Sequence, residues 1–386
     1  MLTTLAIANY RSLRSLVLPL DRLNLVTGAN GSGKSNLYKA LRLLAETAQG
    51  GVVNALAREG GLPSALSAGP EKITAAMQRG DVPIQGGPRQ KPVALRMGFA
   101  GDEFGYVIDL GLPKPSASVF ARDPEIKCEA IWAGPFLRAA NLLVTRRGAL
   151  VRVREGHSWR VDAEHVSAFE SMFTQIADPE RVPEVLALRE SIRGWRFYDH
   201  FRTDADAPAR WTQLGTRSPV LSHDGRDLAA AWQTIREIGD PRALDQAVED
   251  AFPGAEVRVT NNEGCFGLQF SQPGLLRPLS SVELSDGTLR YLLWIAALHT
   301  PRPPPLMILN EPETSLHPDL LPALARLIAR ASERSQVWVV SHASRLIAAL
   351  ESSGDCNTVH LEKELSQPRV AGQDMLDEPA WHWPER

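Results

Sequence analysis

The sequence predicts a mixed α/β protein whose core is interrupted by two inserted segments. A strand-like run at 23–26 precedes a glycine-rich loop and a helical pattern that begins near residue 34. The stretch 93–162 has the alternation and turn residues of antiparallel strands, and from residue 283 onward helical and strand-like patterns alternate. We therefore expect the core to comprise 1–50 and 255–386, with a loop-rich antiparallel β insertion at 51–162 and a helical insertion at 163–254.

Composition argues against several classes of protein. The 386-residue chain has a formal net charge of −3, so no overall basic field indicates nucleic acid. Its three cysteines, Cys128, Cys265 and Cys356, are isolated, which excludes a C-x-x-C zinc site and is typical of a reducing compartment. The N-terminus has no secretory pattern, and the apolar stretch 291–298 is far shorter than the roughly 20 residues that cross a bilayer. We expect a cytoplasmic protein with no membrane association.

The loop Gly-Ala-Asn-Gly-Ser-Gly-Lys-Ser at 28–35 matches the phosphate-loop pattern G-x-x-x-x-G-K-[ST] in full. Its glycines let successive backbone N–H groups curl around phosphates, and the helix that follows adds partial positive charge at its N-terminus. Lys34 is expected to reach the β- and γ-phosphates, and the Ser35 hydroxyl to complete a Mg²⁺ shell. The sequence therefore predicts a nucleoside triphosphate bound by Gly28, Ala29, Asn30, Gly31, Ser32, Gly33, Lys34, Ser35 and Asn36.

Two later apolar runs end in polar residues. The run 306–309 ends in Asn310 and Glu311, and the run 337–340 ends in Ser341 and His342. In an ATPase with a phosphate loop, a neighbouring strand carries a Mg²⁺-directed residue and then a carboxylate that polarises the attacking water. Glu311 stands at that carboxylate position. His342 alone would more often be structural, but its place one strand after Glu311 favours a contact with the γ-phosphate.

The segment Leu-Ser-Asp-Gly-Thr-Leu-Arg at 284–290 lies shortly before these strands. Ser285 can cap the helix that follows, and Gly287 permits close backbone approach. An ordinary helix start has the same pattern. The position before the Glu311 strand favours a segment that contacts nucleotide.

Together these motifs resemble ABC-type ATPase heads of the RecF/SMC/OLD kind and, more narrowly, the bacterial AAA_21-like predicted AAA ATPases. The resemblance rests on the phosphate loop, on Leu-Ser-Asp-Gly-Thr, on Asn-Glu-Pro-Glu-Thr-Ser-Leu-His-Pro at 310–318 and on the terminal Ser-His. It extends from residue 5 to about 361. The opening Asn-Tyr-Arg-Ser at 9–12 is similar to the start of those heads, in which the residue matching Arg11 can lie near the nucleotide.

The resemblance implies a P-loop NTPase head, ABC/RecF-like, that binds ATP and Mg²⁺. Two heads would sandwich two ATP molecules, with Ser285 and Gly287 of one protomer touching the γ-phosphate held by Lys34 of the other. Glu311 would activate water and His342 would sense the γ-phosphate. Hydrolysis, expected to be slow, would release the ATP-dependent homodimer. A role on DNA or in a repair or anti-phage system, with a separate effector protein, is implied as well.

One position departs from the family pattern. The usual Mg²⁺-side aspartate is Asn310 here, and an amide can orient a metal-bound water but contributes no negative charge. Ser35 and Asn310 are therefore the predicted metal residues of a site with reduced charge. A glutamine that contacts metal and water is also expected. The loop region contains three candidates, Gln78, Gln85 and Gln90, and the sequence does not distinguish among them.

Two further segments carry functional residue types. The run 199–206 contains metal-ligand types, although a charged surface loop is the more common interpretation of such a run. The arginine-containing stretch 196–217 could line a nucleic-acid or partner surface.

Three classes of function stay open. The long interval between Ser35 and Ser285 favours a dimerising switch ATPase with inserted subdomains over the energising subunit of a membrane transporter, in which these motifs lie much closer together. The third class is a nucleotide-gated scaffold that hydrolyses little, with Asn310 as the relevant defect. Turnover compared with ATP affinity separates the scaffold from the enzyme.

Overall fold

The protein divides into two compact units, each assembled from segments that are distant in the sequence. The computed structural model describes residues 1–70, 74–79, 81–83, 92–115, 117–120, 122–176, 178–199, 201–364, 367–373 and 378–386. The first unit comprises 1–21, 28–194 and 359–386, and the second comprises 22–27 and 195–358. These boundaries differ from the predicted breaks near residues 50, 162 and 254. The division into a core and two insertions remains a prediction.

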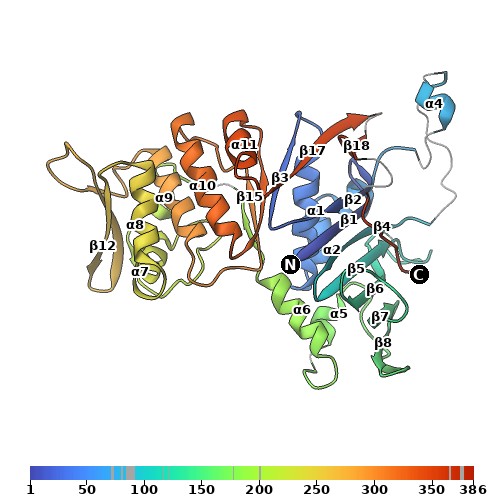
Figure 1. Cartoon of the computed structure of the whole chain (residues 1–386). Coiled ribbons are helices and arrows are strands. Elements are labelled where there is room, and N and C mark those ends of the chain that lie inside the picture. The colour runs from blue at the N-terminus through green and yellow to red at the C-terminus, as the bar shows by residue number, and fades with distance from the viewer. Residues whose placement is uncertain are drawn as a thin grey trace. The chain divides into compact units, whose positions relative to one another are not determined.

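The first unit is built on an eight-stranded antiparallel sheet of order β2-β1-β4-β5-β6-β7-β8-β9. Helix α1 packs against β1 and β4 with Leu37, Leu41 and Leu44 buried, as its helical spacing predicts (Figure 1). The elements of this unit are β1 (Leu2–Tyr10), β2 (Leu13–Pro19), α1 (Lys34–Thr47), α2 (Val52–Arg58), α3 (Gly61–Ala65), α4 (Ala75–Arg79), β4 (Leu95–Gly101), β5 (Phe104–Gly111), β6 (Glu125–Ala133), β7 (Leu142–Arg147), β8 (Leu150–Glu155), β9 (Ser158–Ala163), α5 (Met172–Gln175), α6 (Pro183–Arg193) and β18 (Gln367–Val370).

The antiparallel strands expected within 93–162 are present, with β6 and β9 in addition to those that the alternation indicates. The stretch 163–192 has a sequence pattern that predicts a helix, and this prediction is wrong, because the stretch contains two helices, α5 and α6. Ser171 caps α5 through its hydroxyl, the chain is already extended at Ile176, and Pro183 begins α6. Because proline fixes φ and lacks an N–H, it fits a first turn and not a helix interior.

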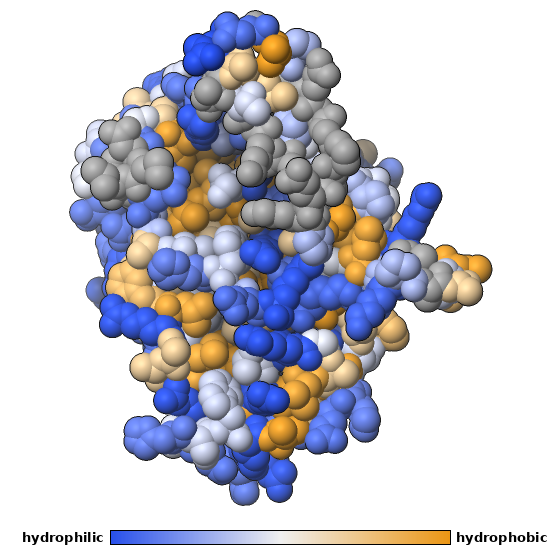
Figure 2. All heavy atoms as spheres, turned by 90° about the vertical axis from the view of Figure 1, so that its right-hand side faces the viewer, coloured by the Kyte–Doolittle hydropathy of each residue, from blue (hydrophilic) through white to orange (hydrophobic). Residues whose placement is uncertain are grey.

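The tail 378–386 is irregular, as predicted, yet it packs against the sheet of the first unit. The Trp381 ring lies 5.7 Å from the Trp132 ring, centroid to centroid. Arg386 forms a 2.7 Å ion pair with the buried carboxylate of Asp109. Figure 2 shows hydrophobic and hydrophilic residues interspersed on the side of the molecule that carries β4–β8 in Figure 1.

The second unit contains a parallel sheet in the order β10-β15-β16-β3, formed by β3 (Leu23–Gly28), β10 (Arg196–Tyr198), β15 (Leu306–Asn310) and β16 (Gln336–Val340). All three pairings are parallel, which confirms the parallel α/β half expected from the alternation of helices and strands. β17 (Cys356–Glu364) begins beside β3, where Asn357 donates to the side-chain oxygen of Asn24 at 2.9 Å. Farther along, in the first unit, β17 pairs with β18.

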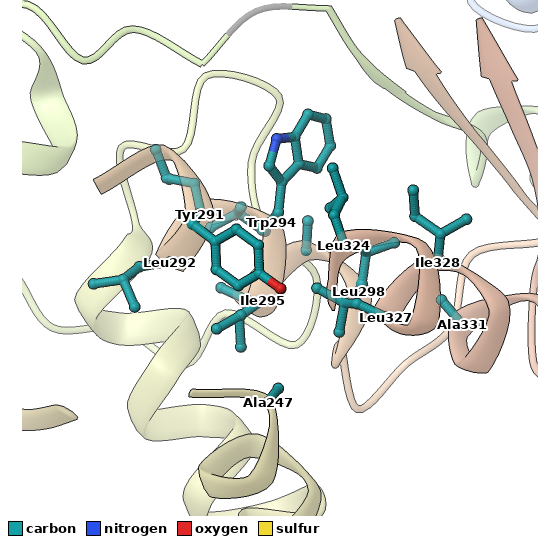
Figure 3. Packing of buried hydrophobic residues seen from close by; sticks show 14 of the residues in the cluster. Ala247, Tyr291, Leu292, Trp294, Ile295, Leu298, Leu324, Leu327, Ile328 and Ala331 are labelled. Carbon is teal, nitrogen blue, oxygen red and sulfur yellow. The ribbon is translucent and has the colours of Figure 1, made fainter. Parts of the chain in front are cut away.

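Helices and a small antiparallel sheet surround the parallel strands. The central helix is α9 (Asp286–Leu298), in which every residue from 289 to 298 is buried. Its Tyr291, Trp294 and Leu298 lie in one core with Leu324 and Ile328 of α10 (Figure 3). The other elements are α7 (Leu228–Ile238), α8 (Pro241–Ala251), α10 (Leu321–Ser332), α11 (Ser344–Glu351), β11 (Gln213–Leu214), β12 (Glu256–Asn262), β13 (Cys265–Ser271) and β14 (Leu279–Ser280).

Local sequence accounts for several of these boundaries. Asp240 caps α8 by accepting from two backbone N–H groups, and Pro241 follows at the first helical position. The hairpin β12–β13 contains the two strand-like runs 256–260 and 266–271. None of the helices in the described part of the chain combines the length and hydropathy that a bilayer-spanning segment needs.

Candidate functional site

The phosphate loop joins β3 to α1 in a conformation that requires glycine. Gly28, Gly31 and Gly33 have φ values of 140°, 79° and 108°. A Cβ at Gly28 would collide with the carbonyl oxygen of Leu361, and one at Gly33 would lie 2.6 Å from the Pro368 ring. The backbone is therefore packed too closely for a side chain at Gly28 and Gly33.

Lys34 lies over this loop. Its ammonium donates to the carbonyl oxygens of Gly28 at 2.5 Å and Ala29 at 3.1 Å, and the residue is 7% exposed. The first turn of α1 receives no side-chain cap, so its N–H groups remain available to an anion. The Ser32 hydroxyl is buried and has no hydrogen-bond partner among the described residues. This donor set fits a triphosphate.

The turn between β1 and β2 lies beside the loop. Asn36 donates from its amide to the Ser12 hydroxyl at 2.8 Å, and the Leu13 side chain approaches Gly33. Arg11, at φ 48°, forms a 2.9 Å ion pair with Glu59, whose hydrogen bond raises the pKa of the guanidinium. Arg11 and Asn36 are thus both engaged by protein groups, and their contact with nucleotide remains a prediction.

In the second unit the register of three parallel strands aligns the other predicted residues. Asn310 of β15 lies opposite Val340 of β16, and Val340 lies opposite Val26 of β3. The next residue on each strand is Glu311, Ser341 and Thr27, respectively. Since Thr27 is bonded directly to Gly28, the strand ends that carry Glu311 and His342 belong to the edge from which the phosphate loop departs.

Glu311 occupies a backbone conformation that is uncommon for a residue with a side chain. Its φ is 49°, and its N–H donates to the carbonyl oxygen of Val340 at 2.8 Å. The Nδ1 atom of His342 lies 3.6 Å from a Glu311 carboxylate oxygen. Both side chains are about half exposed, so the pair can contact a ligand.

Glu313 was not predicted as a site residue, yet it organises the His342 segment. One of its carboxylate oxygens accepts hydrogen bonds from the Ser341 hydroxyl and from the N–H groups of His342 and Ala343. The only signal in the sequence is its place two residues after Glu311, where the intervening Pro312 breaks the strand pattern.

The segment 284–290, here called the signature segment, begins α9 as expected. The Ser285 hydroxyl caps the helix by accepting from the Thr288 N–H at 3.2 Å. Ser285 is exposed and Gly287 half-buried, so both are open to a partner. The neighbouring Asp286 pairs with Arg210 at 2.6 Å.

Arg210 holds this segment in place. It is buried and donates to backbone carbonyls on both sides, at Thr203 and Asp204 and at Ser281, Val282 and Leu284. Arginine at 210 therefore supports the signature segment and is not part of an exposed nucleic-acid surface.

Helix α9 is also tied to the loop that follows Glu311. The Trp294 indole N–H donates to the Pro312 carbonyl at 3.0 Å, and Arg290 donates to the Thr314 carbonyl at 2.7 Å. The backbone of Gly287 approaches the Ser315 carbonyl closely. The signature helix and the Glu311 loop thus form one hydrogen-bonded assembly.

The run 199–206 does not form a metal centre in the described part of the chain, where no three His, Cys, Asp or Glu side chains gather as metal ligands would. Asp204 pairs instead with Arg202 at 2.7 Å. His200, Gln85 and Gln90 lie outside the described residues, as does the side chain of Gln78.

Sequence comparisons match both halves of the site. Residues 1–75 match the model of an AAA ATPase domain, and residues 164–348 match a family described as "AAA domain, putative AbiEii toxin, Type IV TA system". The first range holds the phosphate loop, and the second holds the signature segment, Glu311 and His342. Both ranges of the chain are therefore similar to AAA ATPase domains.

Solved structures show a similar fold. The chain aligns with an SMC head bound to the C-terminal winged-helix domain of ScpA at a TM-score of 0.52 and 13% identity, over 97% of this chain and 98% of that one. The SMC head domain from Thermotoga maritima gives a TM-score of 0.48 and 12% identity over 97% and 99% of the two chains. An SMC head with an extended coiled coil, bound to the C-terminal domain of ScpA from Pyrococcus furiosus, gives a TM-score of 0.48 and 12% identity over 96% and 95%. No curated protein sequence matches the chain.

Proposed function

We propose that the protein is a switch that binds Mg-ATP, dimerises head to head around it and hydrolyses it slowly. The observation that carries the proposal is the strand register, which aligns Glu311 and Ser341-His342 with the end of β3, where the phosphate loop starts. This arrangement supports hydrolysis because the carboxylate and the histidine lie beside the end of the strand that leads into the anion-binding loop.

Each residue has a role within this proposal. The Lys34 ammonium and the N–H groups of the loop hold the β- and γ-phosphates. The Ser35 hydroxyl and the Asn310 amide would hold Mg²⁺, which when bound neutralises charge on the transferred phosphoryl group. Glu311 accepts the proton of the attacking water. His342 contacts a γ-phosphate oxygen through Nε2, since Nδ1 is the nitrogen nearer the carboxylates.

Dimerisation would complete the site. Ser285 and Gly287 are open to a second protomer, and Ser285 stands at the positive end of α9, which favours a phosphate of the partner's nucleotide. We extend the proposal to a separate effector protein, because an SMC head of similar fold is bound by ScpA. The resemblance of the motifs extends it to DNA, in a repair or anti-phage setting. A nucleotide-gated scaffold is the second candidate, favoured by the neutral amide at Asn310.

Light scattering of the wild type and Glu311→Gln, with and without Mg-ATP, tests the proposal while phosphate release is followed in parallel. We expect ATP to convert both proteins to dimers, and the variant to remain dimeric with turnover lowered on the order of 10²- to 10⁴-fold. A variant that stays monomeric at saturating ATP contradicts the switch. Tight ATP binding with neither a dimer nor turnover in the wild type selects the scaffold.

A further inference from the structure

We propose that Glu313 is the positioning residue of this ATPase site, setting the place of His342 relative to Glu311. The proposal rests on the proposed ATPase function and concerns how the site is held in its working geometry. Glu313 lies in the loop after β15, whereas the residues that it binds follow β16.

One oxygen of the Glu313 carboxylate collects three hydrogen bonds. It accepts from the Ser341 hydroxyl at 2.7 Å, from the His342 N–H at 3.0 Å and from the Ala343 N–H at 3.2 Å. These groups lie at the start of α11, whose N-cap residue, Ala343, has no side chain that could cap the helix. Glu313 therefore supplies from another loop the acceptor and the negative charge that a helix N-terminus favours.

The same oxygen also lies near the imidazole. Nδ1 of His342 lies 3.5 Å from the Glu313 oxygen and 3.6 Å from an oxygen of Glu311. The Glu313 side chain is 6% exposed, whereas those of Glu311 and His342 are 45% and 56% exposed. The ring is thus held between one buried and one exposed carboxylate, which leaves Nε2 as the nitrogen directed to the substrate.

The backbone around Pro312 restrains the positions of the two glutamates. Pro312 has a fixed φ and separates Glu311 from Glu313, and its carbonyl is held by Trp294. Glu311 itself has the positive φ of 49°. These restraints direct both glutamates toward one histidine, although they lie two residues apart.

Stability alone does not account for a carboxylate at this position. The second oxygen of Glu313 is buried and has no hydrogen-bond partner among the described residues. Burying a carboxylate oxygen without a partner is unfavourable, so such a group is expected where it serves the site.

The test is a double-mutant cycle of Glu313→Ala and His342→Ala, with steady-state ATP hydrolysis and ATP affinity measured separately. We expect Glu313→Ala to lower kcat on the order of 10²-fold, the scale of a misplaced group, with the dissociation constant for ATP changed less than about threefold. Added to His342→Ala, it should cause little further loss. Glu313→Gln, which keeps the accepting oxygen, should restore most of the turnover.

Additive losses in the double variant would overturn the proposal, and so would equal losses in Glu313→Gln and Glu313→Ala. If Glu313→Ala unfolds, Glu313→Gln alone tests the proposal, because this variant must then retain turnover and the wild-type melting temperature.

If the wild type binds ATP but does not hydrolyse it, the proposed function fails, and imidazole ¹⁵N shifts still test the positioning role. Glu313→Ala must move the His342 shifts and Glu313→Gln must leave them nearly unchanged. Unchanged His342 shifts in Glu313→Ala would refute the positioning role.

Discussion

The indole N–H of Trp294 donates to the carbonyl oxygen of Pro312 at 3.0 Å, and this bond joins the signature helix to the residue after Glu311. Trp294 is fully buried, so loss of the donor leaves a buried carbonyl without this partner. Any movement of α9 is thereby coupled to the position of Glu311.

Trp294→Phe should therefore lower both stability and turnover. We expect the free energy of unfolding, measured with urea, to fall by about 1–3 kcal/mol beyond the effect of lost volume. Trp232→Phe is the matched control, because that indole is equally buried in the same core but its N–H has no partner among the described residues. Equal losses in the two variants would show that the bond to Pro312 is unimportant.

Lys34→Ala should abolish ATP binding. The ammonium is directed into the phosphate loop, and each charged hydrogen bond lost is worth about 1.5–3 kcal/mol, so the dissociation constant should rise at least about 100-fold. Isothermal titration with ATP measures the change. Lys39→Ala removes an exposed lysine of the same helix and should bind as the wild type does. Similar affinity in Lys34→Ala and the wild type would contradict the assigned site.

Asn310→Asp should increase the affinity for magnesium. A carboxylate adds the negative charge that the amide lacks, so the Mg²⁺ concentration for half-maximal turnover should fall by about three- to tenfold. Titration of hydrolysis with Mg²⁺ at saturating ATP gives the value. An unchanged or higher Mg²⁺ concentration for half-maximal turnover would mean that the site is adapted to the Asn310 amide.

Lowering the pH toward 2 should destabilise the segment that precedes residues 284–290. Hydrogen bonds from Arg277 and from Ser280 lower the pKa of Glu283 to about 2. A lowered pKa in the folded state contributes stability above the unfolded value, near 4.5, and this contribution is lost as the pH falls toward 2.

The melting temperature of Glu283→Gln should accordingly lie below that of the wild type at pH 6, and the difference should vanish as the pH approaches 2. Glu263→Gln, at an exposed turn position, is the control and should show no such trend. A difference that stays constant down to pH 2 would rule out the ion pair as its cause.

Much of the site is local in sequence and could therefore be predicted. The phosphate loop, the strand at 306–310 and the Ser285 cap each depend on neighbouring residues, and all three are in the structure. Glu313 and Arg210 could not be predicted, because their roles depend on contacts with segments far away in the chain. Strand β6 was missed too, although its residues 125–130 alternate between polar and apolar types. The structure places Glu129 in a buried ion pair with Arg146.

The close approach of Leu361 to Gly28, and of Pro368 to Gly33, has a consequence for the order of folding. The loop is synthesised before the strands that pack against it. During translation it emerges long before β17 and β18, so it cannot take its packed shape until both strands have been made. Contacts between such distant segments also slow folding. A nascent chain should therefore gain affinity for nucleotide only after β17 and β18 have folded against the loop.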